Sequence, residues 1–152
     1  MRLDELKWTG KWIVPSAADI RDEWKVEYAL PRRNWKGRAE IIGAVYPIFD
    51  DEDDMIAKVQ SGHVLSMTPD MWSMTHNLSM NRDIDEVKAM VATYSRPRDV
   101  DRIVKGFEDG ADMPMAIFIR GAEGSWILSG NTRLNVARLM GIPQKVIVVD
   151  AV

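Results

Sequence analysis

The segment 126–149, WILSGNTRLNVARLMGIPQKVIVV, constrains the fold more than any other part of the chain. Its pattern predicts a short apolar strand, a Ser-Gly-Asn-Thr-Arg turn, one compact apolar helix and a second apolar strand. Gly130 permits a positive φ or the close approach of a ligand to the backbone, and Gly141 is placed to end the helix. A turn of this kind points backbone N–H groups outward from the start of a helix.

The residues of this turn are the candidate functional site. We expect Asn131 or Thr132 to cap the helix through its side chain. Arg133 falls in the first helical turn, where the helix dipole disfavours a cation unless an anion offsets it. The sequence therefore predicts that Gly130, Asn131, Thr132 and Arg133 hold a phosphate or a carboxylate. A structural alternative is that Arg133 pairs with Asp150 or with a carboxylate of the acidic run 50–54.

The second half of the chain has the clearest element pattern. Residues 83–94 and 99–107 carry apolar side chains at three- and four-residue steps, which predicts two helices. An unbroken apolar strand at 115–119 follows, then a turn and the strand 126–128. This order indicates an α+β fold with a mixed sheet partly covered by helices. With 152 residues and 46% hydrophobic side chains, we expect a single compact domain over 1–152.

The first third of the chain is rich in tryptophan and shows little helical periodicity. Residues 11–14 and 24–30 are expected to be half-buried strands of a hairpin or meander, because apolar and polar side chains alternate in the second segment. The segment 31–38 carries four basic residues around Trp35. It is interpreted as a solvated loop, with contact to a phosphate backbone as the alternative.

The acidic run 50–54 precedes the segment 55–60, and helix capping explains most of it. We predict no metal site, because neither this run nor the two histidines show the spacing of metal ligands. The chain has no cysteine, which excludes disulfides and thiolate chemistry.

Charge and hydropathy argue against two further classes of protein, those that coat nucleic acid and those that span a membrane. The chain has 20 basic and 23 acidic side chains and a formal net charge of −3, which argues against a protein that coats nucleic acid through bulk charge. No run approaches the roughly 20 apolar residues of a membrane span. We therefore expect a cytoplasmic protein without a membrane partner.

At Gly130, Asn131, Thr132, Arg133 and Leu134 the chain resembles the ParB N-terminal and sulfiredoxin superfamily. Its members carry a Gly-x-x-Arg turn between a strand and a helix, and Ala137, Gly141 and the strand 146–149 continue that pattern. The resemblance covers about residues 83–150, the expected ParB/sulfiredoxin-like core. The chain is similar to small ParB-like proteins with an SGNTR turn, many of them encoded by phages.

The resemblance implies a nucleotide site, with ATP or CTP as cofactor, together with Mg²⁺, and phosphates on the matching turn. The double-arginine turn of partition ParB proteins and the sulfiredoxin cysteine are absent, which argues against CTP switching and sulfinic acid repair. Arg96 and Arg98 are the candidates for further phosphate contacts, with a solvated corner as the alternative. Glu23, Glu27 and Asp50 are candidate catalytic carboxylates, and the sequence does not select among them.

Two hypotheses follow for function. The first is a nucleotide-binding protein, such as a small ATP- or CTP-dependent phosphotransferase or nucleotide hydrolase. The second is a noncatalytic ParB-like module that binds nucleic acid or a host protein. Its contacts would be the basic residues Arg32, Arg33, Lys36, Arg38, Arg96 and Arg98.

Overall fold

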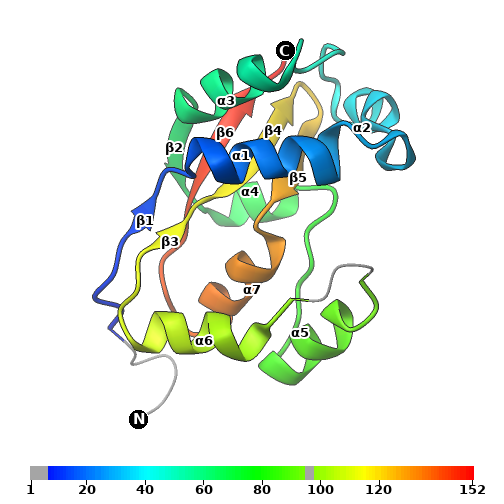
Figure 1. Cartoon of the computed structure of the whole chain (residues 1–152). Coiled ribbons are helices and arrows are strands. Elements are labelled where there is room, and N and C mark those ends of the chain that lie inside the picture. The colour runs from blue at the N-terminus through cyan, green and yellow to red at the C-terminus, as the bar shows by residue number, and fades with distance from the viewer. Residues whose placement is uncertain (1–6, 95–97) are drawn as a thin grey trace.

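The computed structural model describes residues 7–94 and 98–152, and a four-stranded mixed sheet lies at its centre (Figure 1). The strand order is β2 (His63–Ser66), β6 (Lys145–Asp150), β4 (Ala116–Gly121) and β5 (Gly124–Ser129). β4 runs parallel to β6, whereas β2 and β5 are antiparallel to their neighbours. A short parallel pair joins β1 (Trp12–Ile13) to β3 (Met113–Pro114). The expected α+β class with a mixed sheet is confirmed.

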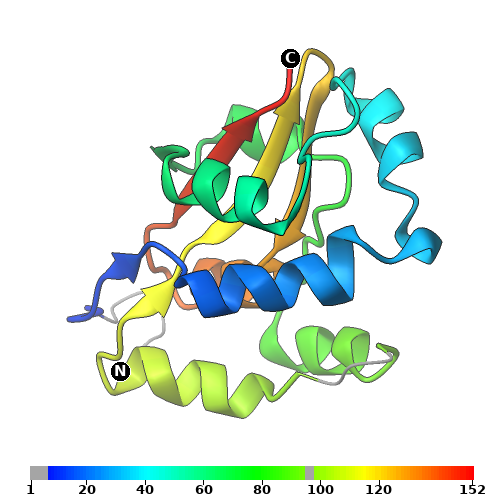
Figure 2. The ribbon, with the colours of Figure 1, turned by 45° about the horizontal axis from the view of Figure 1, so that its top comes forward.

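Helices cover both faces of the sheet (Figure 2). One face packs against α1 (Ala17–Glu23), α2 (Trp35–Ile42) and α3 (Glu52–Gln60). The opposite face packs against α7 (Asn131–Leu139) and the region of α4 (Pro69–Ser73). A third apolar cluster joins α5 (Ile84–Val91) and α6 (Val100–Glu108) to α7. In the described part of the chain, no helix combines the length and apolar character needed to cross a bilayer.

Residues of β4 alternate between the two faces, as the pleat of a strand requires. Ile117 and Ile119 belong to the cluster under α1, α2 and α3, whereas Ala116 and Phe118 belong to the cluster that includes Leu134 of α7. All of these side chains are buried. The expectation that this unbroken apolar run is buried on both faces is confirmed.

Side-chain caps define where most helices begin. In each case a Ser, Asn, Asp or Thr oxygen accepts a hydrogen bond from the backbone N–H three residues further on, which satisfies a donor that the helix itself leaves unbonded. The capping residues of α1 to α6 are Ser16, Asn34, Asp51, Thr68, Asp83 and Asp99. The predicted helices at 83–94 and 99–107 are confirmed as α5 and α6, and capping by the acidic run is confirmed at α3.

The predicted hairpin of the first third is wrong, because β1 pairs in parallel with β3 and the second expected strand does not form. Residues 24–30 do not form a strand, because α1 continues into the π-helix η2 (Trp24–Tyr28). The rings of Trp24 and Tyr28, four residues apart, lie on one face of this helix with centroids 5.1 Å apart. Burial of this aromatic face against the core outweighs the alternating pattern. The expected loop at 31–38 is also wrong, because the 3₁₀-helix η3 (Pro31–Arg33) leads directly into α2.

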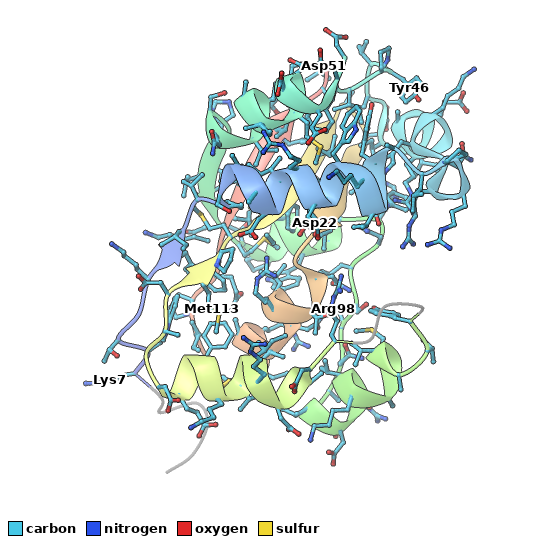
Figure 3. All side chains as sticks on the ribbon, viewed as in Figure 1. Lys7, Asp22, Tyr46, Asp51, Arg98 and Met113 are labelled. Carbon is cyan, nitrogen blue, oxygen red and sulfur yellow. The ribbon has the colours of Figure 1, made fainter. Side chains whose placement is uncertain are left out.

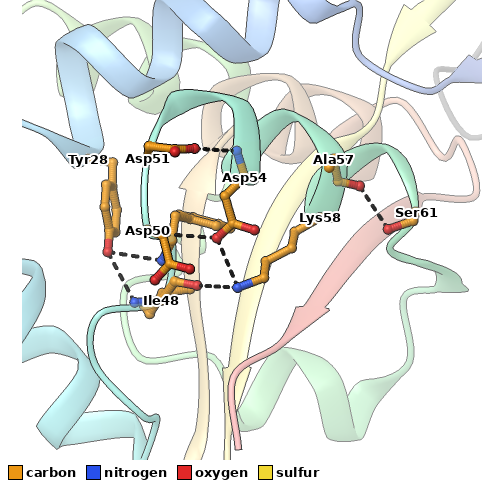
Figure 4. Close-up of polar contacts among 9 residues, drawn as sticks. Tyr28, Ile48, Asp50, Asp51, Asp54, Ala57, Lys58 and Ser61 are labelled. Carbon is orange, nitrogen blue, oxygen red and sulfur yellow. Dashed lines mark hydrogen bonds and ion pairs between the residues drawn. The ribbon is translucent and has the colours of Figure 1, made fainter.

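Tyr28 connects this helical segment to the loop before α3 (Figure 4). Its buried hydroxyl accepts hydrogen bonds from the backbone N–H groups of Ile48 and Phe49, at 3.1 and 3.3 Å. Lys58 of α3 donates to the carbonyl of Ile48 at 3.0 Å and pairs with Asp54 at 3.0 Å. The loop is therefore held by Tyr28 of η2 on one side and by Lys58 of α3 on the other.

Replacing Tyr28 by phenylalanine removes the acceptor and leaves two buried N–H groups unbonded. We expect Tyr28→Phe to lower the free energy of unfolding by about 1–3 kcal/mol, measured by urea denaturation. Tyr46→Phe, at a half-exposed side chain, is the matched control and should change stability by less than about 0.5 kcal/mol. Equal stability of Tyr28→Phe and the unmodified protein would contradict the assigned role of this hydroxyl.

Candidate functional site

The floor of the candidate site is the junction between β5 and α7. Gly130 stands at this junction with φ of +96°, a backbone conformation that side chains other than glycine rarely adopt. A Cβ atom at Gly130 would lie 2.8 Å from the Cα atom of Ala116 in β4. The expected positive φ is confirmed. Because the turn packs closely on β4, a substitution here disturbs folding whether or not a ligand binds.

The start of α7 differs from the starts of α1 to α6. Gly130 occupies its N-cap position and no side chain caps it, so the expected cap by Asn131 or Thr132 is wrong. The Asn131 amide instead donates to the hydroxyl of Ser79 at 3.0 Å, and Thr132 is buried. Backbone donors at the first turn of α7 are therefore not satisfied by a capping side chain, and the positive end of the helix dipole is not screened by one.

Arg133 lies in this first turn and is held by a backbone carbonyl. Its Nε atom donates to Pro114 at 3.1 Å. Burial lowers the pKa of the Arg133 guanidinium, and the nearby charges of Glu23 and Arg98 act on this pKa in opposite directions. The alternative pairing of Arg133 with Asp150 is wrong, because Asp150 accepts two hydrogen bonds from Arg120, at 2.7 and 3.1 Å.

A cavity of about 840 Å³ opens beside the start of α7. Asp22 on α1 and Arg98 before α6, both of which line it, are labelled in Figure 3. Its charged lining consists of Arg33, Arg38, Arg98, Arg133, Asp22, Glu23 and Glu27. Gly130, Asn131 and Thr132 line the cavity at the start of α7. A smaller cavity of about 160 Å³ shares part of this wall, including Glu23, Ser129 and Arg133.

Glu23 lines both cavities and its charge acts on Arg133 of the turn. Burial raises the pKa of Glu23, and the like charges of Glu27 and Asp22 raise it further. A hydrogen bond from the Ser129 side chain and the charge of Arg98 lower the same pKa without cancelling the effect of burial. A carboxyl group with a raised pKa is better suited to proton transfer near neutral pH than an ordinary glutamate.

At the other end of the cavity, Glu27 pairs with two arginines. Its carboxylate oxygens lie 2.6 Å from Arg38 and 3.2 Å from Arg33. The Arg38 guanidinium also lies over two indole rings, 5.0 Å from the centroid of Trp35 and 5.1 Å from that of Trp126. Arg38 is therefore fixed by charge and by cation–π contact at once.

The structure brings together most of the residues that the sequence singles out. Gly130, Asn131, Thr132, Arg133 and Arg98 all line the large cavity, whereas Arg96 lies outside the described residues. Glu23 and Glu27 reach the cavity, but Asp50 does not line it and its backbone N–H bonds to Asp54 beside α3.

From the sequence, Ser129 belongs to the turn but not to the predicted phosphate-binding residues, and neither a site role for Trp126 nor the pairing of Glu27 with arginines was predicted. The four-residue spacing of Glu23 and Glu27 could have shown that both lie on one helical face, had 24–30 been interpreted as helical. The basic residues of the segment 31–38 fall into two groups. Arg33 and Arg38 pair with Glu27, whereas Arg32 and Lys36 are exposed.

Comparison with protein-family models, with curated proteins and with solved structures finds no match to this chain. The resemblance to ParB and sulfiredoxin proteins thus stays a prediction. Within the two described ranges, no group of three or more His, Asp or Glu side chains is arranged to hold a metal ion.

The raised pKa of Glu23 predicts a pH-dependent cost to stability. A buried carboxyl whose pKa is higher in the folded than in the unfolded chain destabilises the fold once pH exceeds the unfolded value, about 4.3. Glu23→Gln removes this ionisation and can still accept a hydrogen bond from Ser129. We expect its melting temperature, relative to that of the unmodified protein, to rise between pH 4 and pH 7.5.

Glu40→Gln is the control, because Glu40 is exposed on α2 and should give a difference that changes little with pH. If the difference for Glu23→Gln is the same at both pH values, the carboxyl is not desolvated in the folded chain.

Proposed function

We propose that the chain is a nucleotide-binding protein that holds phosphates at the start of α7. The observation that carries the proposal is the large cavity, where the uncapped helix start lies beside Arg133 and Arg98. Backbone N–H groups at a helix start and guanidinium groups are the donors that recognise phosphate. The resemblance to ParB and sulfiredoxin proteins supports the same choice and favours ATP or CTP.

The charges beside the turn favour an anion over a neutral ligand. Burial lowers the pKa of Arg133, Glu23 partly offsets this effect, and Arg98 lowers the pKa again because the two cations repel each other. A phosphate between them removes this repulsion and replaces the water that Arg133 has lost on burial. Arg33 and Arg38 contribute less, because Glu27 already balances part of their charge.

The position and raised pKa of Glu23 favour a phosphate-transfer reaction at this site in addition to nucleotide binding. We propose that it accepts the proton of the hydroxyl or water that attacks the terminal phosphate, while the bond from phosphorus to the leaving oxygen breaks. Its position beside Arg133, with the Ser129 hydroxyl hydrogen-bonded to it, allows the proton acceptor and the phosphate-binding cation to act on one bound group. The activity would be phosphate transfer or nucleotide hydrolysis.

Binding is tested by thermal shift and calorimetry with ATP, ADP, CTP and GTP, because a ligand that binds the folded state raises its apparent stability. We expect Arg98→Ala to weaken binding by roughly tenfold or more, from the loss of a charge-assisted hydrogen bond. Arg98 is exposed, so this variant should keep the fold, and Arg133→Ala should weaken binding further.

Arg32→Ala is the matched control, since Arg32 is exposed and does not line the cavity. Absence of binding to every nucleotide would overturn the proposal. Salt-sensitive binding of nucleic acid by the same sample would then favour the noncatalytic module instead.

Turnover is tested separately with Glu23→Gln. We expect this variant to bind nucleotide with an affinity within about threefold of the unmodified protein but to lose at least about a hundredfold in rate, the usual contribution of general base catalysis. Phosphate release and transfer are followed with radiolabelled nucleotide. An unchanged rate would show that Glu23 is not the proton acceptor.

A further inference from the structure

We propose that the end of the cavity at Trp126 binds the base of the nucleotide, and that Glu27 selects bases that carry an exocyclic amino group. The inference rests on the proposed function, because it takes the phosphates to lie at the start of α7. It concerns a different set of cavity-lining residues, namely Glu27, Arg38 and Trp126, which lie outside the turn 130–133.

The distance along β5 fits a nucleotide. Trp126 and Ser129 are three residues apart on this strand and both line the cavity. Because β5 carries a bulge between them, the two positions pair with Ile119 and Ile117, only two residues apart on β4, and lie about 7 Å apart, comparable with the separation of the base and the first phosphate of a nucleotide. With the phosphates fixed beside Ser129 and Gly130, the base therefore reaches the wall formed by Trp126 and η2.

The side chains at the wall formed by Trp126 and η2 are planar, and their neighbours hold them in place. Arg38 is held between Glu27 and the rings of Trp35 and Trp126, and only 18% of its side chain is exposed. The other ring partner of Trp126 is His76, whose ring is nearly parallel at 13°. The guanidinium is covered by the rings of Trp35 and Trp126, so its part is to hold the Glu27 carboxylate and the Trp126 ring in fixed positions at the cavity wall.

Glu27 gives this end its selectivity. A carboxylate paired with two guanidinium groups presents only acceptor oxygens to a ligand. Its side chain is 16% exposed and lines the cavity, so it can accept a hydrogen bond from a bound base. Cytosine and adenine offer an amino donor at one position of the ring, whereas uracil and hypoxanthine carry a carbonyl oxygen there, which a carboxylate repels.

The test compares matched ligand pairs by isothermal titration calorimetry. The pairs are CDP with UDP and ADP with IDP, since the members of each pair differ by an amino group against a carbonyl. We expect the amino-bearing member of every pair that binds measurably to bind at least about tenfold more tightly, the typical value of one hydrogen bond to a charged group.

Glu27→Gln should reduce this ratio to about threefold or less, because an amide can turn its own N–H₂ toward a carbonyl. Glu40→Gln, on the exposed side of α2, is the control and should keep the ratio of the unmodified protein. The measurement on the unmodified protein decides the matter even if Glu27→Gln loses the ion pairs with Arg33 and Arg38 and folds poorly.

Equal affinity within a pair, a preference for the carbonyl member, or a ratio that Glu27→Gln leaves unchanged would overturn the inference while the proposed nucleotide function stands. If no diphosphate binds at all, the proposed function fails first, and the selectivity inference fails with it.

Discussion

The close packing of Gly130 on Ala116 is the constraint on which the site depends. The positive φ of Gly130 turns the chain sharply from β5 into α7, and the missing Cβ lets this turn lie directly on β4. Leu134 of α7 is thereby placed against the sheet, and Arg133 is directed toward the carbonyl of Pro114. A larger residue would push α7 away from the sheet, so the same contact that builds the core also sets the positions of the start of α7 and of Arg133.

The opposite wall of the cavity depends on a helix that changes its winding. α1 begins at the Ser16 cap and passes into the π-helix η2, so Glu23 and Glu27 follow one another along one side of a continuous helical segment. Tyr28 anchors the end of this segment on the loop before α3. The two carboxylates therefore have different partners. Glu23 accepts a hydrogen bond from Ser129 beside the turn, whereas Glu27 pairs with Arg33 of η3 and Arg38 of α2.

Local signals explain what could be predicted from the sequence. α5 and α6 were predictable because capping aspartates and apolar spacing agree, and the unbroken apolar runs identified the central strands. Trp24 and Tyr28 fit both a two-residue and a four-residue period, so periodicity alone could not separate a strand from a helix. The turn at 130–133 was identifiable as one contiguous motif. Glu27, Arg38 and Trp126 meet only through tertiary packing, for which a single sequence carries no signal.

The charges of the cavity are arranged so that anion binding and proton transfer reinforce each other in the proposed complex. In that complex a phosphate at the start of α7 stabilises the cation of Arg133, whose pKa is lowered by burial and, to a smaller extent, by repulsion from Arg98. The same negative charge lies near Glu23 and raises the pKa of this carboxyl beyond the value that burial already produces. Glu23 therefore becomes a stronger proton acceptor when its substrate is in place. Glu27 lies four residues further along the same helical segment, where its charge is balanced by the ion pairs with Arg33 and Arg38.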